Sequence, residues 1–252
     1  MMRLHVAAGL LLAALFVGFA ASRTLLGPRG GWPAVGNNAS VVLHRLLCAI
    51  LKVRVKRFGA PGPGKRLVAA NHVSWLDVLV LGATEPIAFL AKNEIGASRW
   101  TRWLIDLQGA VYIDRTRKRC IPVVNAEIAR RLIDAAPVVL FAEATTSDGA
   151  RLLPFRSSHF EAVRQARAVV QPVYLNYRAI GGLRVTRRDL PNVAWYGDMT
   201  FLPSFRKVLA CGGVDCEVRY GDVIPWEEAC DRKGLARKAE AALRNLKTIG
   251  RR

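Results

Sequence analysis

Residues 67–81 form a mostly apolar stretch, LVAANHVSWLDVLVL, that is interrupted by Asn71, His72 and Asp77. A carboxylate that accepts from one imidazole nitrogen fixes the histidine tautomer, and the other nitrogen can then act as a general base. Such a pair is a base with its orienting group but without a nucleophile of its own. The chemistry it suits is therefore activation of a hydroxyl group that the substrate brings.

His72 and Asp77 can meet only if the chain turns between them. Five residues of a regular helix rotate by about 500°, which leaves the two side chains on different faces. If residues 66–71 form a strand and a helix starts at Trp75, the residues between supply the turn, and His72 lies at the carboxyl end of a strand, where α/β sheets commonly hold ligands. A structural alternative stays open, because Ser74 and Asp77 also match a capping box.

The elements that would position this pair follow from the pattern of apolar residues. Short apolar runs alternate with longer helical patterns, which predicts one α/β domain with a mixed, largely parallel sheet flanked by helices. Ser158 and Glu161 match a capping box at the start of one helix. We expect strands at residues 52–58, 66–70, 86–91, 110–113, 138–141, 169–176 and 214–220, and helices at residues 78–83, 98–107, 122–135, 158–166 and 225–246.

The N-terminal region is a candidate membrane segment. Residues 4–21 are almost wholly apolar and lie between Arg3 and Arg23. This length is enough for a bilayer span, so we expect a membrane helix within an anchor at residues 1–26, with a cleaved signal peptide as the alternative. Residues 27–38 are rich in Gly, Pro and Asn and predict a connector.

A second element of this region could also contact a membrane. Within residues 27–56, an amphipathic helix is either membrane-contacting or an ordinary core-facing helix. We expect the α/β domain itself to span residues 57–252. The apolar residues that share one face of this helix are Leu43, Leu46, Leu47, Ile50 and Leu51.

Net charge and cysteine content indicate the class of partner and the cellular compartment. The chain of 252 residues is 52% hydrophobic and carries a formal net charge of +19, which suits an anionic partner such as a membrane surface, a nucleic acid or an acidic substrate. The five cysteines are odd in number and scattered, which favours a reducing compartment. With the positive-inside bias, this predicts a domain on the cytoplasmic side of the inner membrane.

The sequence gives little support for nucleotide, metal or nucleic-acid binding. GAPGPGKR at residues 59–66 resembles a P-loop, but Arg66 stands where Ser or Thr would hold magnesium, and Pro61 and Pro63 remove backbone donors. Four histidines without an H-E-x-x-H pattern predict no metal site. The basic residues are spread along the chain without a nucleic-acid motif, so we expect no nucleic-acid partner, although a non-enzymatic basic binding module remains the rival class.

From about residue 44 onward the chain resembles the glycerolipid (lysophosphatidate-type) acyltransferase family in four ordered blocks. NHVSWLD at residues 71–77 resembles the N-H-x4-D block, and GAVYIDR at residues 109–115 resembles the second block, whose arginine helps bind the acceptor's anionic head. FAEATTS at residues 141–147 resembles the third block, usually F-P-E-G-T-R-S, and QPV at residues 171–173 resembles the fourth.

The resemblance implies a reaction and a set of site residues. His72, oriented by Asp77, would deprotonate the hydroxyl of a lyso-lipid, which then attacks an acyl thioester on acyl carrier protein or coenzyme A. No metal and no cofactor beyond that co-substrate is implied. For Glu143, capping of the loop after a strand is the alternative role. The residues implied in acceptor binding are Asn71, Gly109, Arg115, Glu143, Thr145, Thr146 and Pro172.

Departures in the third block bear on the acceptor. Ala144 stands in place of glycine and Thr146 in place of arginine, so a bidentate phosphate ligand is missing. The strings TTSDGARLLPFRSS and YGDMTFLP are more similar to the branch that acylates lyso-ornithine lipid, whose head is an amino acid. Arg151 or Arg156 could replace the missing arginine, so lysophosphatidate stays open. Asp148 could bind an ammonium group, or simply form an Asp-Gly turn.

Overall fold

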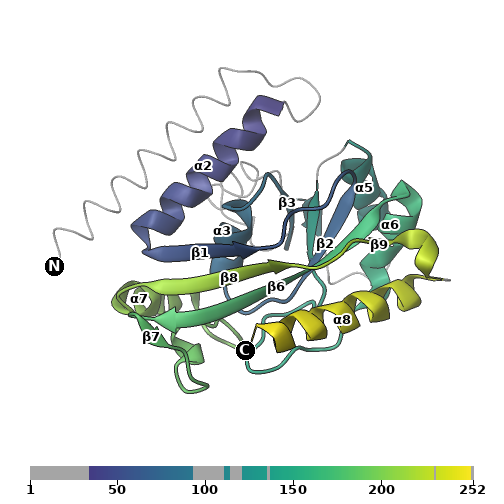
Figure 1. Cartoon of the computed structure of the whole chain (residues 1–252). Coiled ribbons are helices and arrows are strands. Elements are labelled where there is room, and N and C mark those ends of the chain that lie inside the picture. Colours follow the sequence, from purple (N-terminus) through teal and green to yellow (C-terminus); the bar gives the residue numbers. More distant parts are fainter. Residues whose placement is uncertain (1–33, 93–110, 114–120, 135–136, 230, 251–252) are drawn as a thin grey trace.

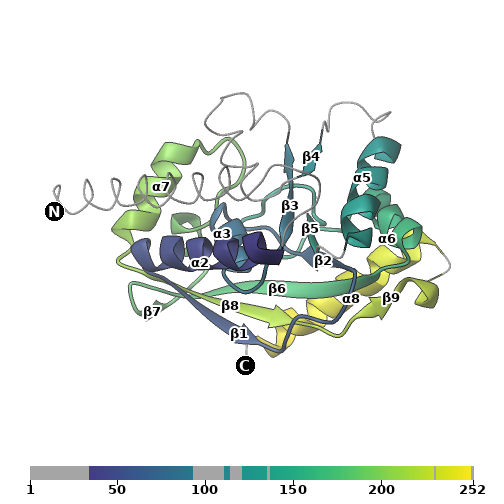
Figure 2. The same cartoon turned by 90° about the horizontal axis from the view of Figure 1, so that it is seen from above.

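The computed structural model describes residues 34–92, 111–113, 121–134, 137–229 and 231–250. Their strands form one mixed sheet in the order β1-β8-β6-β2-β5-β3-β4, and β7 and β9 pair with β6 (Figure 1 and Figure 2). The strands are β1 (Val53–Phe58), β2 (Arg66–Ala70), β3 (Ala88–Lys92), β4 (Val111–Ile113), β5 (Val138–Phe141), β6 (Val169–Ile180), β7 (Leu183–Arg184), β8 (Val214–Tyr220) and β9 (Ile224–Pro225).

Helices cover both faces of this sheet. Helices α2, α3 and α7 pack on one face, and α5, α6 and α8 pack on the other, because each group shares a separate apolar cluster with alternate strand residues. Figure 2 shows α7 at one end of the molecule and α5 and α6 at the other. The helices are α2 (Ala34–Ile50), α3 (Leu76–Gly82), α5 (Ile121–Ile133), α6 (Glu161–Ala166), α7 (Phe201–Ala210) and α8 (Arg232–Ile249), with 3₁₀ turns η3 (Ser157–Phe160), η4 (Leu190–Asn192) and η5 (Trp226–Glu228).

The centre of the sheet is the part that matters for the site. Strand β2 lies between β5 and β6 and runs parallel to both, with Ala70 opposite Phe141 on one side and Val173 on the other. All five β2 residues are buried, as expected for a strand covered on both faces. Because parallel strands end at the same edge, the segments that follow β2 and β5 meet there.

The expected α/β class with a mixed, mostly parallel sheet is confirmed, and the differences lie at element ends. The capping box expected at Ser158 and Glu161 is wrong, because Ser157–Phe160 form a 3₁₀ turn and α6 begins only at Glu161 without a side-chain cap. The last helix begins at Arg232 rather than 225, because Ile224–Pro225 pair with β6 and the Asp231 carboxylate then accepts from Gly234 N at 2.7 Å. Strand β6 runs on to Ile180.

The N-terminal part of the described chain belongs to the core. Helix α2 begins inside the expected connector, and its Leu43 and Leu47 are buried, as is Leu51 after it, whereas Leu46 is exposed. This burial supports the core-facing alternative for that helix. The expected domain boundary at residue 57 falls inside β1 and is therefore wrong.

Two further expectations concern residues that the structure does not describe. The expected anchor at residues 1–26 and the expected helix at residues 98–107 lie outside the described residues. Within the part of the chain that the structure describes, no helix combines the length and apolarity that a bilayer crossing requires.

Candidate active site

The site begins where β2 ends. Asn71 continues the hydrogen-bonding of the strand through its side chain, which accepts from Leu175 N at 2.8 Å and donates to Leu175 O at 3.1 Å. The amide thus replaces a backbone pair with β6 and releases the chain to turn directly afterwards. Since Asn71 is buried and both ends of its amide are engaged, its role here is to support the turn rather than to contact an acceptor.

The turn brings His72 and Asp77 together as the sequence predicted. His72 Nδ1 lies 2.8 Å from Asp77 Oδ2, and the same oxygen accepts from Val73 N at 2.7 Å and Ser74 N at 2.9 Å. The second oxygen, Oδ1, accepts from the Tyr177 hydroxyl at 2.6 Å. Asp77 has no exposed surface, and its four donors offset the cost of burying a carboxylate.

The capping-box alternative for Asp77 holds in part, because Asp77 N donates to the Ser74 carbonyl rather than to Ser74 Oγ. The Asp77 carboxylate reaches back to Ser74 N, and Ser74 Oγ accepts from Leu76 N at 3.3 Å, as side chains do at a helix start. One carboxylate therefore supports the first turn of α3 and orients the histidine. Capping and catalysis are not competing explanations at this position.

The imidazole is held so that its second nitrogen is available. With Nδ1 directed at Asp77, proton uptake falls to Nε2, which bonds to no protein group among the described residues. The ring stacks on Phe141 with centroids 3.8 Å apart and an interplanar angle of 9°. The His72 side chain keeps 19% of its surface exposed, so a substrate can reach it.

Side chains that could compete as nucleophiles are engaged elsewhere. Ser74 Oγ donates to Val193 O at 2.6 Å, and Ser147 Oγ donates to His72 O at 3.2 Å. Cys216 is buried, and burial, followed by the charge of Asp77, raises the pKa of its thiol well above the usual value. These described hydroxyl and thiol groups are therefore engaged or buried, and the arrangement suits activation of a hydroxyl that the substrate supplies.

Glu143 follows β5 and ties the two strand ends together. Its Oε1 accepts from His72 N at 3.0 Å and its Oε2 accepts from Leu153 N at 2.9 Å. Burial raises the pKa of Glu143 to about 7, although both backbone hydrogen bonds act to lower it. Since both carboxylate oxygens hold backbone groups, the structure favours the loop-capping role over contact with the acceptor.

The loop at residues 143–153 lies against His72. Ser147 N donates to His72 O at 2.8 Å, one residue after the partly exposed Thr146. Thr145 is exposed, and its hydroxyl reaches only Thr146 O at 3.5 Å. Ala144 has φ = +61°, a left-handed conformation that favours glycine, which explains why the corresponding block usually has glycine there.

The other expected acceptor residues lie apart from this cluster. Pro172 is buried inside β6 opposite Ala69, and its carbonyl accepts from Gly221 N at 2.8 Å, so it serves the sheet. Gly109 and Arg115 lie outside the described residues. Among those described, no group of side chains could hold a metal ion.

Two residues of the site were missed by reasoning from the sequence. Tyr177 orients Asp77 from a strand 100 residues away, and Phe141 supports the imidazole ring. Tyr177 does share the inward side of β6 with Val173 and Leu175, but a tyrosine at such a position normally indicates packing only.

Comparison with known proteins agrees with this geometry. The family model named Acyltransferase matches residues 54–176. The lyso-ornithine lipid O-acyltransferase of Brucella abortus is 36% identical over 81% of this chain and 79% of that protein. The 1-acyl-sn-glycerol-3-phosphate acyltransferase of Neisseria meningitidis is 32% identical over 90% and 87%.

A solved structure has the same fold. The crystal structure of the 1-acyl-sn-glycerophosphate (LPA) acyltransferase from Thermotoga maritima superimposes with a TM-score of 0.62 at 17% identity, covering 96% of both chains. At that identity the likeness speaks for the fold, and the sequence relatives speak for the family. From these sequence relatives, and with the His72–Asp77 pair in place, the chain belongs to the PlsC-type acyltransferase family and is an acyltransferase.

Proposed function

We propose that the protein transfers a fatty acyl group from an acyl thioester, carried by acyl carrier protein or coenzyme A, to the hydroxyl of lyso-ornithine lipid. The observation that supports this acceptor is the loop at residues 143–153, which bonds to the His72 backbone but has Thr146 where phosphate-reading relatives usually have arginine. Relatives named lyso-ornithine lipid O-acyltransferase, at 36% and 34% identity, support the same acceptor.

The reaction follows from the orientation of the imidazole. His72 Nε2 takes the proton of the acceptor hydroxyl while the oxygen attacks the thioester carbonyl. The tetrahedral intermediate collapses with cleavage of the C–S bond, and the imidazolium returns the proton to the departing thiolate. The products are an ester and a free thiol, no acyl-enzyme forms, and no cofactor is needed beyond the thioester.

The amino-acid head of this acceptor fits a site with few cations. It offers one carboxylate and at least one ammonium group, so it needs fewer arginines than a phosphate. For Asp148 the structure supports the Asp-Gly turn, because its Oδ1 accepts from Ala150 N at 2.9 Å. The exposed cations nearest in sequence are Arg151, in the loop at residues 143–153, and Arg156, shortly after it.

We also propose that the enzyme works at the cytoplasmic face of the inner membrane, on an anionic surface. The net charge of +19 and the apolar residues 4–21 support this location. Helix α7 supports it as well, because its Phe201 and Leu202 are exposed apolar side chains. The Phe201 ring lies 5.4 Å from that of Trp75, within the catalytic turn at residues 72–77. The test is cell fractionation with mass spectrometry of the N-terminus, where a mature end near Ser22 would indicate a signal peptide instead.

A second candidate is 1-acylglycerol-3-phosphate acylation. The Neisseria meningitidis relative of that name covers more of this chain, 90%, than either of the two lyso-ornithine relatives named above, at 81%. Arg151 or Arg156 would then have to bind the phosphate in place of the missing arginine. This candidate shares the catalytic pair and differs only in how the acceptor head is recognised.

The deciding experiment compares kcat/KM for the two acceptors with one acyl donor, on the purified full-length chain in mixed micelles. We expect a higher value with lyso-ornithine lipid, and a clear preference for lysophosphatidate would overturn the assignment. Thr146→Arg restores the cation usual in this block and should shift the ratio towards lysophosphatidate. Ala241→Arg, on the exposed side of α8, adds the same charge elsewhere and should leave the ratio unchanged.

A further inference from the structure

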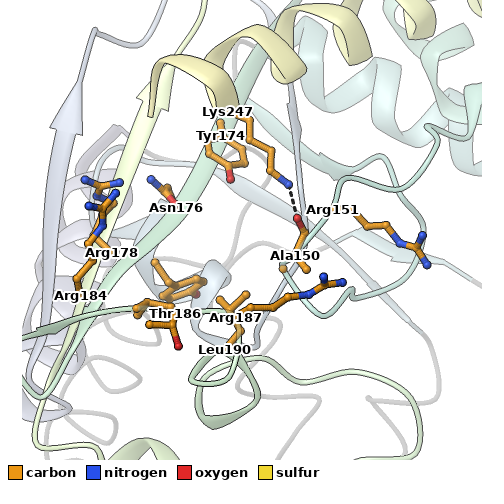
Figure 3. Close-up of a pocket in the computed structure, with 13 residues that line it drawn as sticks. Ala150, Arg151, Tyr174, Asn176, Arg178, Arg184, Thr186, Arg187, Leu190 and Lys247 are labelled. Carbon is orange, nitrogen blue, oxygen red and sulfur yellow. Dashed lines mark hydrogen bonds between the residues drawn. The ribbon is translucent and has the colours of Figure 1, made fainter. Parts of the chain in front are cut away.

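A basic cavity of about 320 Å³ lies beside the carboxyl-terminal half of β6 and the end of α8 (Figure 3). Its walls come from β6, from β7 and the segment that follows it, from the loop at residues 149–151 and from α8. Five basic side chains and no carboxylate line it among the described residues: Arg151, Arg178, Arg184, Arg187 and Lys247. His72 is not among its lining residues, so the cavity is separate from the general base.

The charges of this cavity are only partly balanced. Arg178 lies 3.4 Å from Glu217 and donates to Gly250 O at 2.7 Å, and Lys247 donates to Ala150 O at 2.9 Å. By contrast, none of the described carboxylates lies within ion-pair distance of Arg151, Arg184 or Arg187, and all three are exposed. Cations gathered in one concave surface raise its positive potential, which favours an anion inside it.

The size and lining of the cavity say more about that anion. Pockets of roughly 300–1,000 Å³ take organic ligands, so this one has room for more than an inorganic ion. Val185 and Leu190 contribute apolar wall, while guanidinium groups suit the paired oxygens of a phosphate. The combination fits a phosphate ester with an organic group attached.

Two walls of the cavity also contact the catalytic turn. The loop at residues 149–151 continues from Ser147, which donates to His72 O. Tyr177 lines the cavity and donates its hydroxyl proton to Asp77. A ligand here would therefore touch the elements that position the base without touching the base itself.

We propose that this cavity is a second anion site that binds an organic phosphate, beyond the acyl transfer assigned to His72. Two sources share this chemistry at a membrane-bound acyltransferase: the headgroup of an acidic phospholipid, and the phosphate-bearing carrier of the acyl thioester. Binding at this site is predicted to fall with increasing salt, because it depends on exposed cations.

The test measures binding rather than turnover, on the purified full-length chain in detergent. One arm titrates free coenzyme A, and the other adds phosphatidylglycerol in nanodiscs, with phosphatidylcholine nanodiscs as reference. We expect saturable binding in at least one arm, and about tenfold weaker binding for the Arg184→Gln/Arg187→Gln double variant. Binding of coenzyme A identifies the carrier as the source, and binding of phosphatidylglycerol identifies the lipid.

Two controls separate this site from general charge and from catalysis. Arg232→Gln/Arg237→Gln removes the same charge from exposed positions of α8 and should bind like wild type. His72→Ala should also bind like wild type, so a failure of the proposed acyl transfer would not affect this result. The proposal is overturned if neither probe binds, or if both arginine double variants lose affinity equally.

Discussion

Two buried carboxylates lie in the segments that follow two neighbouring parallel strands, and they differ in how many donors they have. Asp77, after β2, accepts from four groups, namely a ring nitrogen, two backbone amides and the Tyr177 hydroxyl. Glu143, after β5, accepts from two backbone amides, and burial raises its pKa to about 7. The carboxylate with the complete set of donors holds the base, and the other holds a loop and titrates near neutrality.

The two sites also influence each other. The negative charge of Asp77 raises the pKa of Glu143, after the larger effect of burial, while the charge of Lys247 lowers it. Two nearby carboxylates cannot both ionise freely in a buried setting. The comparison shows that burial alone does not define what a carboxylate does here, because Asp77 contacts the His72 ring whereas Glu143 contacts backbone amides.

The largest expected effect is the loss of activity when His72 is replaced, compared with replacement of Glu143. His72→Ala should lower kcat/KM by about 10³-fold or more, because it removes the general base, and should change the free energy of unfolding little. Thiol release from the acyl thioester, with urea unfolding alongside, measures both. Glu143→Gln should keep much more activity. If His72→Ala retained near-wild-type turnover, the division of roles between the two strand ends would be wrong.

The next prediction tests the donors of Asp77. Asp77→Asn should reduce kcat by about 10²-fold and the free energy of unfolding by about 3 kcal/mol, because an amide NH₂ group would face N–H donors in a buried place. Tyr177→Phe removes a single donor and should be milder, about 1 kcal/mol, with an altered pH profile of kcat. If Asp77→Asn destabilised the fold but left kcat intact, Asp77 would serve only the helix start.

The raised pKa of Glu143 predicts how the free energy of unfolding depends on pH. Between its ordinary pKa, near 4.5, and about 7, the folded protein holds a proton on Glu143 that the unfolded chain has lost. Raising the pH through this window should therefore lower the free energy of unfolding, by about 2–3 kcal/mol, and Glu143→Gln should remove that part of the slope. Urea unfolding at pH 5 and pH 8 measures it, and an unchanged slope in the variant would contradict the assignment.

The smallest effect concerns the backbone of the Glu143 loop. Ala144 adopts φ = +61°, so Ala144→Gly should stabilise the protein by up to about 1 kcal/mol in thermal or urea unfolding. Arg167→Gly is the matched control, since Arg167 ends α6 with φ = +48°, away from the site. It should gain similar stability without affecting kcat. A loss of stability in Ala144→Gly would mean that the left-handed residue carries no strain.

Local patterns were sufficient for much of the architecture. The alternation of short apolar runs placed β1, β2, β5 and β8 within about a residue, because burial on one or both faces dictates residue type along a strand. Element ends were less predictable, as at Arg232, where pairing of β9 with β6 competes with an intrinsic helix pattern. Such competition involves residues far away in sequence.

The amino-acid sequence by itself determined the His72–Asp77 pair, since both residues and the turn that joins them lie within six consecutive positions and depend on local geometry. Only the tertiary structure decided that Tyr177 completes the donor set, that Glu143 clamps His72 N, and that basic residues from four segments enclose one cavity. The physical reason is that the contacts of Tyr177 and Glu143 join positions about 70 to 100 residues apart. The parallel pairing of β2 with β5 and β6 brings these positions together, and no periodicity along the chain reports that pairing.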